Sequence, residues 1–307
     1  MTDGSHSPRA SMPGELALLL LLATLWGASY SFIKLGVTTI PPITLIALRT
    51  LIAGVLLLLL MRWRGISMPT DMATWGRFAF QACLNSVIPW TLIAWAERSV
   101  DAGLATILNS AAPIFTFLFT ALVTRHEAAT ARKLFGVTAG MAGICLIVGV
   151  KAFDHAGEGL VAEIAIVAAT ICYACAAIFS RGFVGLHSMA PAAGSLLCGT
   201  VALIPLSLVF EQPWTLAPST SSILALLGLA VFSTAAAFVI YFRLIQTLGS
   251  VGTTAQAYLR VPIGVALSVM FLGEHLSPTA WIGLACVVAG VAAMTIPARA
   301  REATKVA

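Results

Sequence analysis

The chain has 307 residues, of which 59% are hydrophobic and only 9% are charged. A soluble protein of average composition carries about 25% charged residues. So few charges cannot form a water-facing surface, so lipid must cover most of the chain. The net charge of +5 comes without any Lys/Arg-rich stretch with interleaved aromatic residues, which excludes a nucleic-acid partner. No cofactor or metal is expected, because the six cysteines lie in apolar runs without the histidines or second cysteine pair of a zinc site.

Apolar segments follow one another along almost the whole chain. A helix needs about 20 mostly apolar residues to cross a bilayer. Ten segments meet this requirement, at 15–36, 43–62, 74–96, 103–124, 132–150, 160–183, 190–210, 220–245, 251–272 and 279–297. Pro41 and Pro42 mark the first break, and Asp101 is placed to cap the fourth helix through its side-chain oxygen. The sequence therefore predicts an all-α membrane protein with ten transmembrane helices.

The segments divide the chain into two halves of equal helix number. The expected units are a tail at 1–14, a first five-helix repeat at 15–150, a connecting loop at 151–159, a second repeat at 160–297 and a tail at 298–307. The first apolar run has no A-x-A-like cleavage site at its end, so it is expected to be a retained helix and not a signal peptide.

The basic residues are distributed unequally between the two sides of the membrane. With both termini on the cytoplasmic side, twelve lysines and arginines fall on that side and three, Lys34, Arg98 and Lys151, on the other. Cytoplasmic loops carry an excess of positive residues. We therefore predict cytoplasmic termini, in the inner (plasma) membrane of a bacterium. Arg49 and Arg260 are different, because both lie within predicted spans.

The two halves resemble each other at a constant offset of 147 residues. This offset pairs Glu127 with Glu274, Gly136 with Gly283, Gly143 with Gly290, Asn109 with Gln256, Trp26 with Tyr173 and Lys34 with Arg181. Because each repeat has five helices, the second must enter the membrane in the opposite direction to the first. Inverted repeats around a midplane site are frequent in secondary transporters, and the expected fold has a central cavity between them.

Several motifs together resemble a known family. They are Trp26-Gly27-Ala28-Ser29-Tyr30-Ser31-Phe32-Ile33-Lys34, Arg49, Pro113…Glu127…Gly136 and Pro262…Gly273-Glu274…Gly283. The pattern is similar to the drug/metabolite transporter superfamily, and within it to the ten-helix EamA-type branch. The resemblance implies export of amino acids and related metabolites, and the chain looks most like bacterial aromatic amino acid exporters. One departure is Arg125-His126-Glu127, where the pattern usually has Leu-Gly-Glu.

Two helices carry matching stripes of aromatic and basic residues. Trp26, Tyr30 and Lys34 are spaced four residues apart on one face of the first helix, and Tyr173 and Arg181 repeat the pattern on the sixth. We interpret the aromatic residues as substrate-binding and the two cations as gating residues at opposite mouths of the cavity. The alternative is that Lys34 and Arg181 extend to the membrane surface without a further role.

Other polar residues within spans complete the predicted site. They are Gln81, Asn85 and Trp90 on the third helix, Asn109 on the fourth, and Gln256, Tyr258 and Arg260 on the ninth. Polar groups are costly in hydrocarbon, so they tend to face a cavity or another helix. The offset pairs Asn109 with Gln256, whereas counting back from the prolines pairs it with Tyr258, and the two choices lie on different faces of the ninth helix. Contacts between helices are the alternative role for all of them.

These features predict a secondary transporter that works by alternating access, and not an enzyme. The expected substrate is a neutral or aromatic amino acid, with a drug or another metabolite as the alternative. A distant alternative is an intramembrane serine protease using Ser29, but no span contains a histidine to act as its base. All acidic residues lie at span ends or in loops, which favours a facilitator or weak proton coupling. The expected partners are the substrate and lipid, in a monomer or weak homodimer.

Overall fold

The computed structural model describes residues 12–119, 131–154, 158–183, 185–247 and 256–295, and all secondary structure within these ranges is helical. In chain order the elements are α1 (Met12–Gly36), α2 (Pro42–Trp63), α3 (Met72–Ala82), the π-helix η1 (Cys83–Val87), α4 (Ile88–Ala96), α5 (Ala102–Asn109), α6 (Ala112–Phe119), α7 (Ala131–Asp154), α8 (Glu158–Ser180), the 3₁₀-helix η3 (Arg181–Phe183), α9 (Met189–Phe210), the 3₁₀-helix η4 (Pro213–Thr215), α10 (Thr220–Ala230), the π-helix η5 (Val231–Ala236), α11 (Ala237–Thr247), α13 (Gln256–Leu272) and α14 (Pro278–Thr295).

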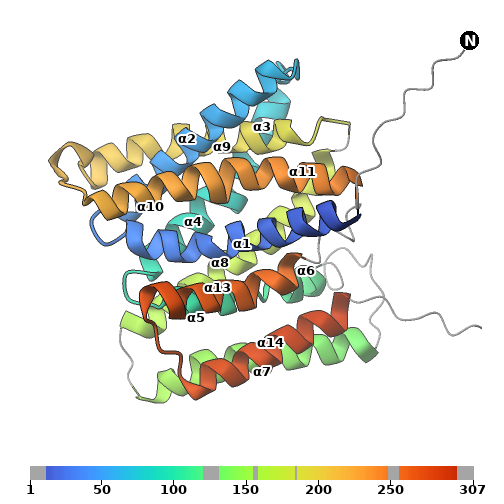
Figure 1. Cartoon of the computed structure of the whole chain (residues 1–307), viewed down its shortest axis with the longest axis vertical. Coiled ribbons are helices and arrows are strands. Elements are labelled where there is room, and N and C mark those ends of the chain that lie inside the picture. The colour runs from blue at the N-terminus through green and yellow to red at the C-terminus, as the bar shows by residue number, and fades with distance from the viewer. Residues whose placement is uncertain (1–11, 120–130, 155–157, 184, 248–255, 296–307) are drawn as a thin grey trace, which may run out of the picture.

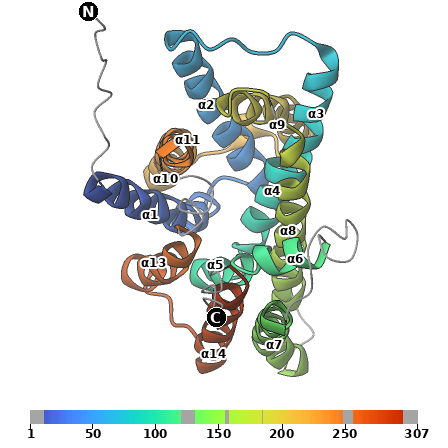
Figure 2. The same ribbon diagram turned by 90° about the vertical axis from the view of Figure 1, so that its right-hand side faces the viewer.

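These helices confirm the predicted class, an all-α membrane protein. Seven described helices, some of them built from two elements in series, are long and apolar enough to span a bilayer, and α7, α13 and α14 contain shorter apolar stretches. Figure 1 shows the helices side by side, running across the view, with α7 and α14 paired at one edge of the molecule. Figure 2, turned by 90°, shows α1 between α11 on one side and α13 on the other. We call the end at which α1 begins the near end, and the end at which α1 finishes the far end.

The third span of each repeat contains the same local irregularity. Both are α-helices interrupted by a π-helix, η1 in the first repeat and η5 in the second. The offset of 147 residues carries Cys83, the first residue of η1, to Ala230, directly before η5. A π-helical turn contains an extra residue, and such turns are often found at functional sites. The sequence did not predict them, and they alter which residues share a face of these spans, one of which carries Gln81 and Asn85 of the predicted site.

The pairing of α7 with α14 shows the two-fold relation between the repeats. A Cβ atom at Gly143 would lie 2.8 Å from the carbonyl oxygen of Gly283, and one at Gly290 would lie 2.5 Å from that of Gly136. The repeat offset exchanges the members of these two contacts. Small residues allow helix backbones to approach closely in membranes. The glycines identified in the sequence therefore pack α7 against α14 within one chain.

Carboxylates of the second repeat cap helices of the first repeat at the far end. Glu274, in the loop between α13 and α14, accepts hydrogen bonds from the backbone N–H groups of Ala102 (2.8 Å) and Gly103 (3.0 Å). Glu211 accepts from the N–H groups of Ile43 (3.0 Å) and Thr44 (2.6 Å) at the start of α2. A negative charge at a helix N-terminus satisfies free N–H groups and complements the helix dipole.

The prediction for Asp101 was wrong. Asp101 occupies the N-cap position of α5, but its side chain makes no capping hydrogen bond. Glu274 caps α5 instead, because the far-end loop of the second repeat brings its carboxylate onto the N–H groups of the first two residues of α5. A tertiary contact has replaced a local one.

A cavity lies at the near end of the molecule. It has a volume of about 700 Å³ and lies between α1, α9 and α11 and the segment that follows α2. Leu18, Val239 and Ile240 contribute apolar walls, and Arg64, His187 and Arg243 contribute charged or titratable groups. Next to it, Arg243 forms an ion pair with Glu15 at 3.0 Å, which joins α11 to the first turn of α1. The near end of the molecule is therefore hollowed between the two repeats.

Candidate functional site

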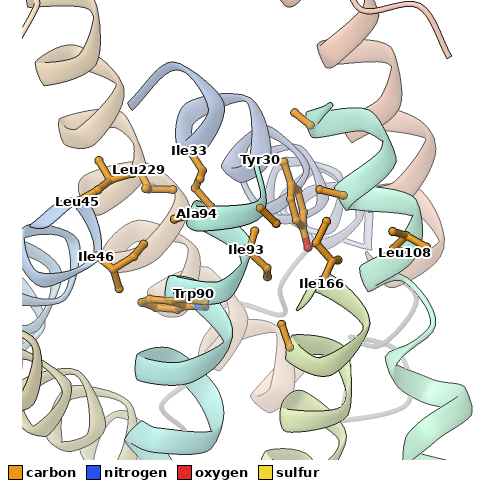
Figure 3. Packing of buried hydrophobic residues seen from close by; sticks show 14 of the residues in the cluster. Tyr30, Ile33, Leu45, Ile46, Trp90, Ile93, Ala94, Leu108, Ile166 and Leu229 are labelled. Carbon is orange, nitrogen blue, oxygen red and sulfur yellow. The ribbon is translucent and has the colours of Figure 1, made fainter. Parts of the chain in front are cut away.

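A network of hydrogen bonds joins three helices in the middle of the molecule. The side-chain amide of Asn109, at the last residue of α5, donates to the hydroxyl of Tyr30 on α1. The Oδ1 atom of Asn109 accepts from Thr170 of α8 at 3.2 Å. All three side chains are buried. The helix is interrupted after Asn109, ahead of Pro113, because a proline has no N–H to continue the ladder. Figure 3 shows the Tyr30 side chain reaching from α1 toward Ile166 of α8.

Arg49 lies within α2 and joins the two π-helical spans. Its Cζ atom is 3.6 Å from the ring centroid of Trp90, which follows η1 in α4. Its Nε atom donates to the Oγ1 atom of Thr234, which belongs to η5, at 3.0 Å. Arg49 is only 4% exposed, so a guanidinium is held inside a membrane-spanning segment. Stacking on an indole ring stabilises such a cation through the negative face of the ring.

Two further polar residues extend this cluster. Tyr173, half-buried on α8, lies within electrostatic reach of Arg49 and Arg260 and close to Trp90. Tyr30 likewise interacts electrostatically with both Arg49 and Arg260. We call the following seven residues the central polar cluster: Tyr30, Arg49, Trp90, Asn109, Thr170, Tyr173 and Arg260. They come from six spans and from both repeats, as a site between inverted repeats requires.

Lys34 joins two elements at the far end of the molecule. Its Nζ atom donates to the backbone carbonyl oxygens of Glu97 and Val100, both at 2.7 Å, where α4 ends. A cation at this position satisfies carbonyl groups that a helix C-terminus leaves free. Of the two roles that the sequence left open for Lys34, extension to the membrane surface does not describe this contact. Lys34 instead holds α1 against the end of α4.

Glu97 is the unusual acidic residue of this region. It lies directly after α4 and is fully buried, and neither of its carboxylate oxygens has a hydrogen-bond partner within the described part of the chain. Burial raises the pKa of Glu97 well above its usual range, opposed in part by Lys34 and reinforced by Glu274. The sequence placed every acidic residue at a span end or in a loop, and position alone did not reveal that this one is removed from water.

Five of the predicted substrate residues belong to the central polar cluster: Tyr30, Trp90, Asn109, Tyr173 and Arg260. Trp26 lies elsewhere, packed on Phe238 and Tyr241 of α11 with ring centroids 6.4 and 5.5 Å apart. It belongs to a separate small core with Leu18 and Ile240, which also line the near-end cavity.

The remaining predicted residues are not brought into this network by any hydrogen bond among the described residues. Gln81 and Gln256 are buried, and their side-chain oxygens have no hydrogen-bond partner within the described ranges. Asn85 is half-buried within η1. Tyr258 belongs to α13 and Arg181 to η3, but their side chains lie outside what the structure describes. Glu127 also lies outside the described residues.

Sequence reasoning did not assign a role to three residues that form the central contacts. Arg49 was recognised as a cation within a span but was given no role, and Thr170 and Thr234 were not singled out. The useful signal for Arg49 was its charge within a predicted span, since an intramembrane charge is a candidate functional residue by default. Threonines carry no such signal. In many apolar helices the threonine hydroxyl simply donates to a backbone carbonyl of its own helix, as Thr106 does to Ala102.

Comparison with known proteins identifies the family. The model of the EamA-like transporter family matches residues 13–149 and again 160–296. The chain belongs to the EamA-like transporter family. Both matched regions together cover most of the chain, so it consists of two EamA repeats, as the internal offset predicted. This membership also confirms that the chain is a transporter and not an enzyme, which removes the intramembrane protease.

The relatives cover nearly the whole chain at modest identity. The uncharacterized inner membrane transporter YedA of Escherichia coli (strain K12) is 28% identical over 91% of this chain and 89% of its own length. A probable terminal-alkyne amino-acid exporter of Streptantibioticus cattleyicolor is 27% identical over 90% and 91%, and a probable amino-acid metabolite efflux pump of Escherichia coli (strain K12) is 24% identical over 94% and 97%. A solved crystal structure aligns with a TM-score of 0.65, covering 94% of this chain and all of the other at 19% identity.

Proposed function

We propose that this protein exports small organic metabolites, with neutral or aromatic amino acids as the main substrate class. The central polar cluster carries the proposal. It places hydroxyl, amide and guanidinium groups beside Trp90 and the rings of Tyr30 and Tyr173, within spans that otherwise pack through apolar side chains. Such a mixture suits an amphipathic solute with one apolar side and one charged end. Two relatives of similar length are described as probable exporters of amino acids or amino-acid metabolites.

The mechanism that we propose is alternating access between the two ends. In this mechanism the contacts of Lys34, Glu97 and Glu274 keep the far end closed, and a solute enters through the near-end cavity on its way to the cluster. Opening the far end requires Lys34 to leave the carbonyls at the end of α4. Lys34 is therefore the proposed far gate, and Arg181 is its proposed counterpart. Trp26, between the cavity and Tyr30 along α1, is a proposed contact on the route.

Counterflow in proteoliposomes tests this function. Purified protein is reconstituted, the vesicles are loaded with a high concentration of one unlabelled amino acid, and entry of the same labelled amino acid is followed. We expect accelerated entry for at least one neutral or aromatic amino acid, because a carrier exchanges substrate across the membrane. Absence of counterflow for every one of the twenty amino acids, with correctly inserted protein, would remove amino acids as the substrate.

A further inference from the structure

The positive charge of Arg49 in the central polar cluster has a role that rests on the proposed function. We propose that Arg49, assisted by Arg260, binds the carboxylate of the transported solute, and that this contact makes the transporter prefer amino acids to the corresponding amides and amines. Arg49 is thus a specificity-determining residue of a site for organic carboxylates.

Two neighbours hold the guanidinium group of Arg49 in a fixed orientation. Trp90 covers one face of the Arg49 guanidinium, with Cζ 3.6 Å from the ring centroid, and Thr234 accepts from Nε at 3.0 Å. The two terminal nitrogens form no hydrogen bond with any described residue. They form the edge of a planar fork that matches the two oxygens of a carboxylate. The protein therefore fixes the orientation of this group and leaves its binding edge unused.

A second feature is the balance of charge around Arg49. A buried charge is costly unless it is paired with an opposite charge and hydrogen-bonded. Among the described residues, no carboxylate lies within 4 Å of Arg49. Glu97 is the described carboxylic acid that interacts with Arg49 electrostatically, and its backbone carbonyl accepts a hydrogen bond from Lys34. The other polar groups around Arg49 are neutral hydroxyls, those of Tyr30, Tyr173 and Thr234.

A third feature is a second cation in the same place. Arg260 interacts electrostatically with Tyr30 and Tyr173, the same two tyrosines that interact with Arg49. Its Nε atom is buried without a hydrogen-bond partner within the described part of the chain. Both guanidinium groups lie within electrostatic reach of the same two tyrosine side chains, so an anion bound beside those tyrosines would be attracted by both. A carboxylate there would satisfy both, while the ring of Trp90 and the rings of the tyrosines contact the apolar part of the solute.

The alternative is that Arg49 only ties α2 to α4 and η5. A matched pair of probes separates the two roles, because an amino acid and its carboxamide differ mainly in the carboxylate. Competition is measured in the counterflow assay with L-phenylalanine against L-phenylalaninamide and L-leucine against L-leucinamide. We expect the amide to compete roughly 30-fold more weakly than the acid, since loss of one partner of a buried charge pair weakens binding by about that factor or more.

The variant Arg49→Met should reduce the apparent affinity for the acid by roughly 30-fold or more and leave competition by the amide within about threefold of wild type. Arg49→Lys keeps the charge but loses the fork, so it should give an intermediate loss. Arg98→Met is the matched control, because Arg98 is exposed beyond the end of α4 and should leave both probes unchanged.

Equal competition by acid and amide in the wild-type protein overturns the inference, even if Arg49→Met does not fold. An equal loss for both probes in Arg49→Met also overturns it and assigns Arg49 a structural role. Failure of the proposed function looks different, because then the wild-type protein shows no counterflow with any amino acid.

Discussion

We predict that Glu274 stabilises the far end of the molecule more than Asp101 does, although Asp101 occupies the N-cap position of α5. The perturbation is Glu274→Ala, which removes both acceptors from the N–H groups of Ala102 and Gly103 at 2.8 and 3.0 Å. The carboxylate belongs to the second repeat and the N–H groups to the first, so the substitution breaks a contact between repeats.

The magnitude follows from the number of groups left without a partner. Ala102 is fully buried and Gly103 is buried beside it, and each unpaired buried N–H costs about 1–3 kcal/mol. Some of this loss is recovered at a helix end, where water or Asp101 reaches one of the two groups. We therefore expect a net destabilisation of about 2–4 kcal/mol, above the roughly 1 kcal/mol of a typical N-cap. For a protein of this size this corresponds to a fall in melting temperature of roughly 5–10 °C.

The assay is thermal unfolding of the purified protein in one detergent, comparing Glu274→Ala, Glu274→Gln and Asp101→Ala. Glu274→Gln retains a neutral acceptor and should fall between wild type and Glu274→Ala. Asp101→Ala is the matched control, because the Asp101 side chain makes no capping hydrogen bond. The reasoning is refuted if Asp101→Ala lowers the melting temperature as much as Glu274→Ala.

Three other predictions concern the far gate and the packing of the repeats. Because burial raises the pKa of Glu97, the closed form keeps a proton that the unfolded or open form releases, so stability is lost as the pH rises above the ordinary range of a glutamate. Melting curves between pH 5 and 9 should therefore fall more steeply with pH for wild type than for Glu97→Gln, and parallel curves would contradict this. Lys34→Met removes both hydrogen bonds to the Glu97 and Val100 carbonyls, so it should open the far end more often. The measurement is maleimide labelling of a single cysteine placed in the far-end part of α4, which should increase. Unchanged labelling would remove Lys34 as a gate. Gly290→Ala should destabilise the protein by about 1–3 kcal/mol, since its Cβ would lie 2.5 Å from a backbone oxygen, while Gly76→Ala, with open space around it, should be neutral or slightly stabilising by thermal unfolding.

The fold was predictable because it depends on features that one sequence displays directly. Apolar length gave the spans, and α2 and α9 agree with the predicted segments to within one residue at each end. The 147-residue offset gave the repeats, because glycines that pack backbones, such as Gly143 and Gly290, tolerate little substitution and keep their register. These constraints act within a helix or between equivalent helices.

The site was less predictable because it depends on contacts between helices that are distant in sequence. Asp101 and Glu274 show this clearly, since the local rule named Asp101 and a loop more than 170 residues away provides the cap instead. The π-helices also alter the spacing within the third and eighth spans, so the residues that share a face with Asn85 could not be inferred from α-helical spacing alone. Arg49 was visible as an intramembrane charge, but its partners Trp90 and Thr234 lie on other spans and could not be inferred from spacing.

The most direct test of the account is the orientation of equivalent loops in the two repeats. Ser67, in the loop between α2 and α3, and Thr215, between α9 and α10, are both exposed and occupy corresponding places. Single cysteines are placed at these positions in a cysteine-free background and labelled in intact cells with a maleimide that does not cross the membrane. We predict that only one of them is labelled until the cells are permeabilised, with Thr215→Cys reacting from outside. Labelling of both from the same side would contradict two inverted repeats, and with them the central site that they enclose.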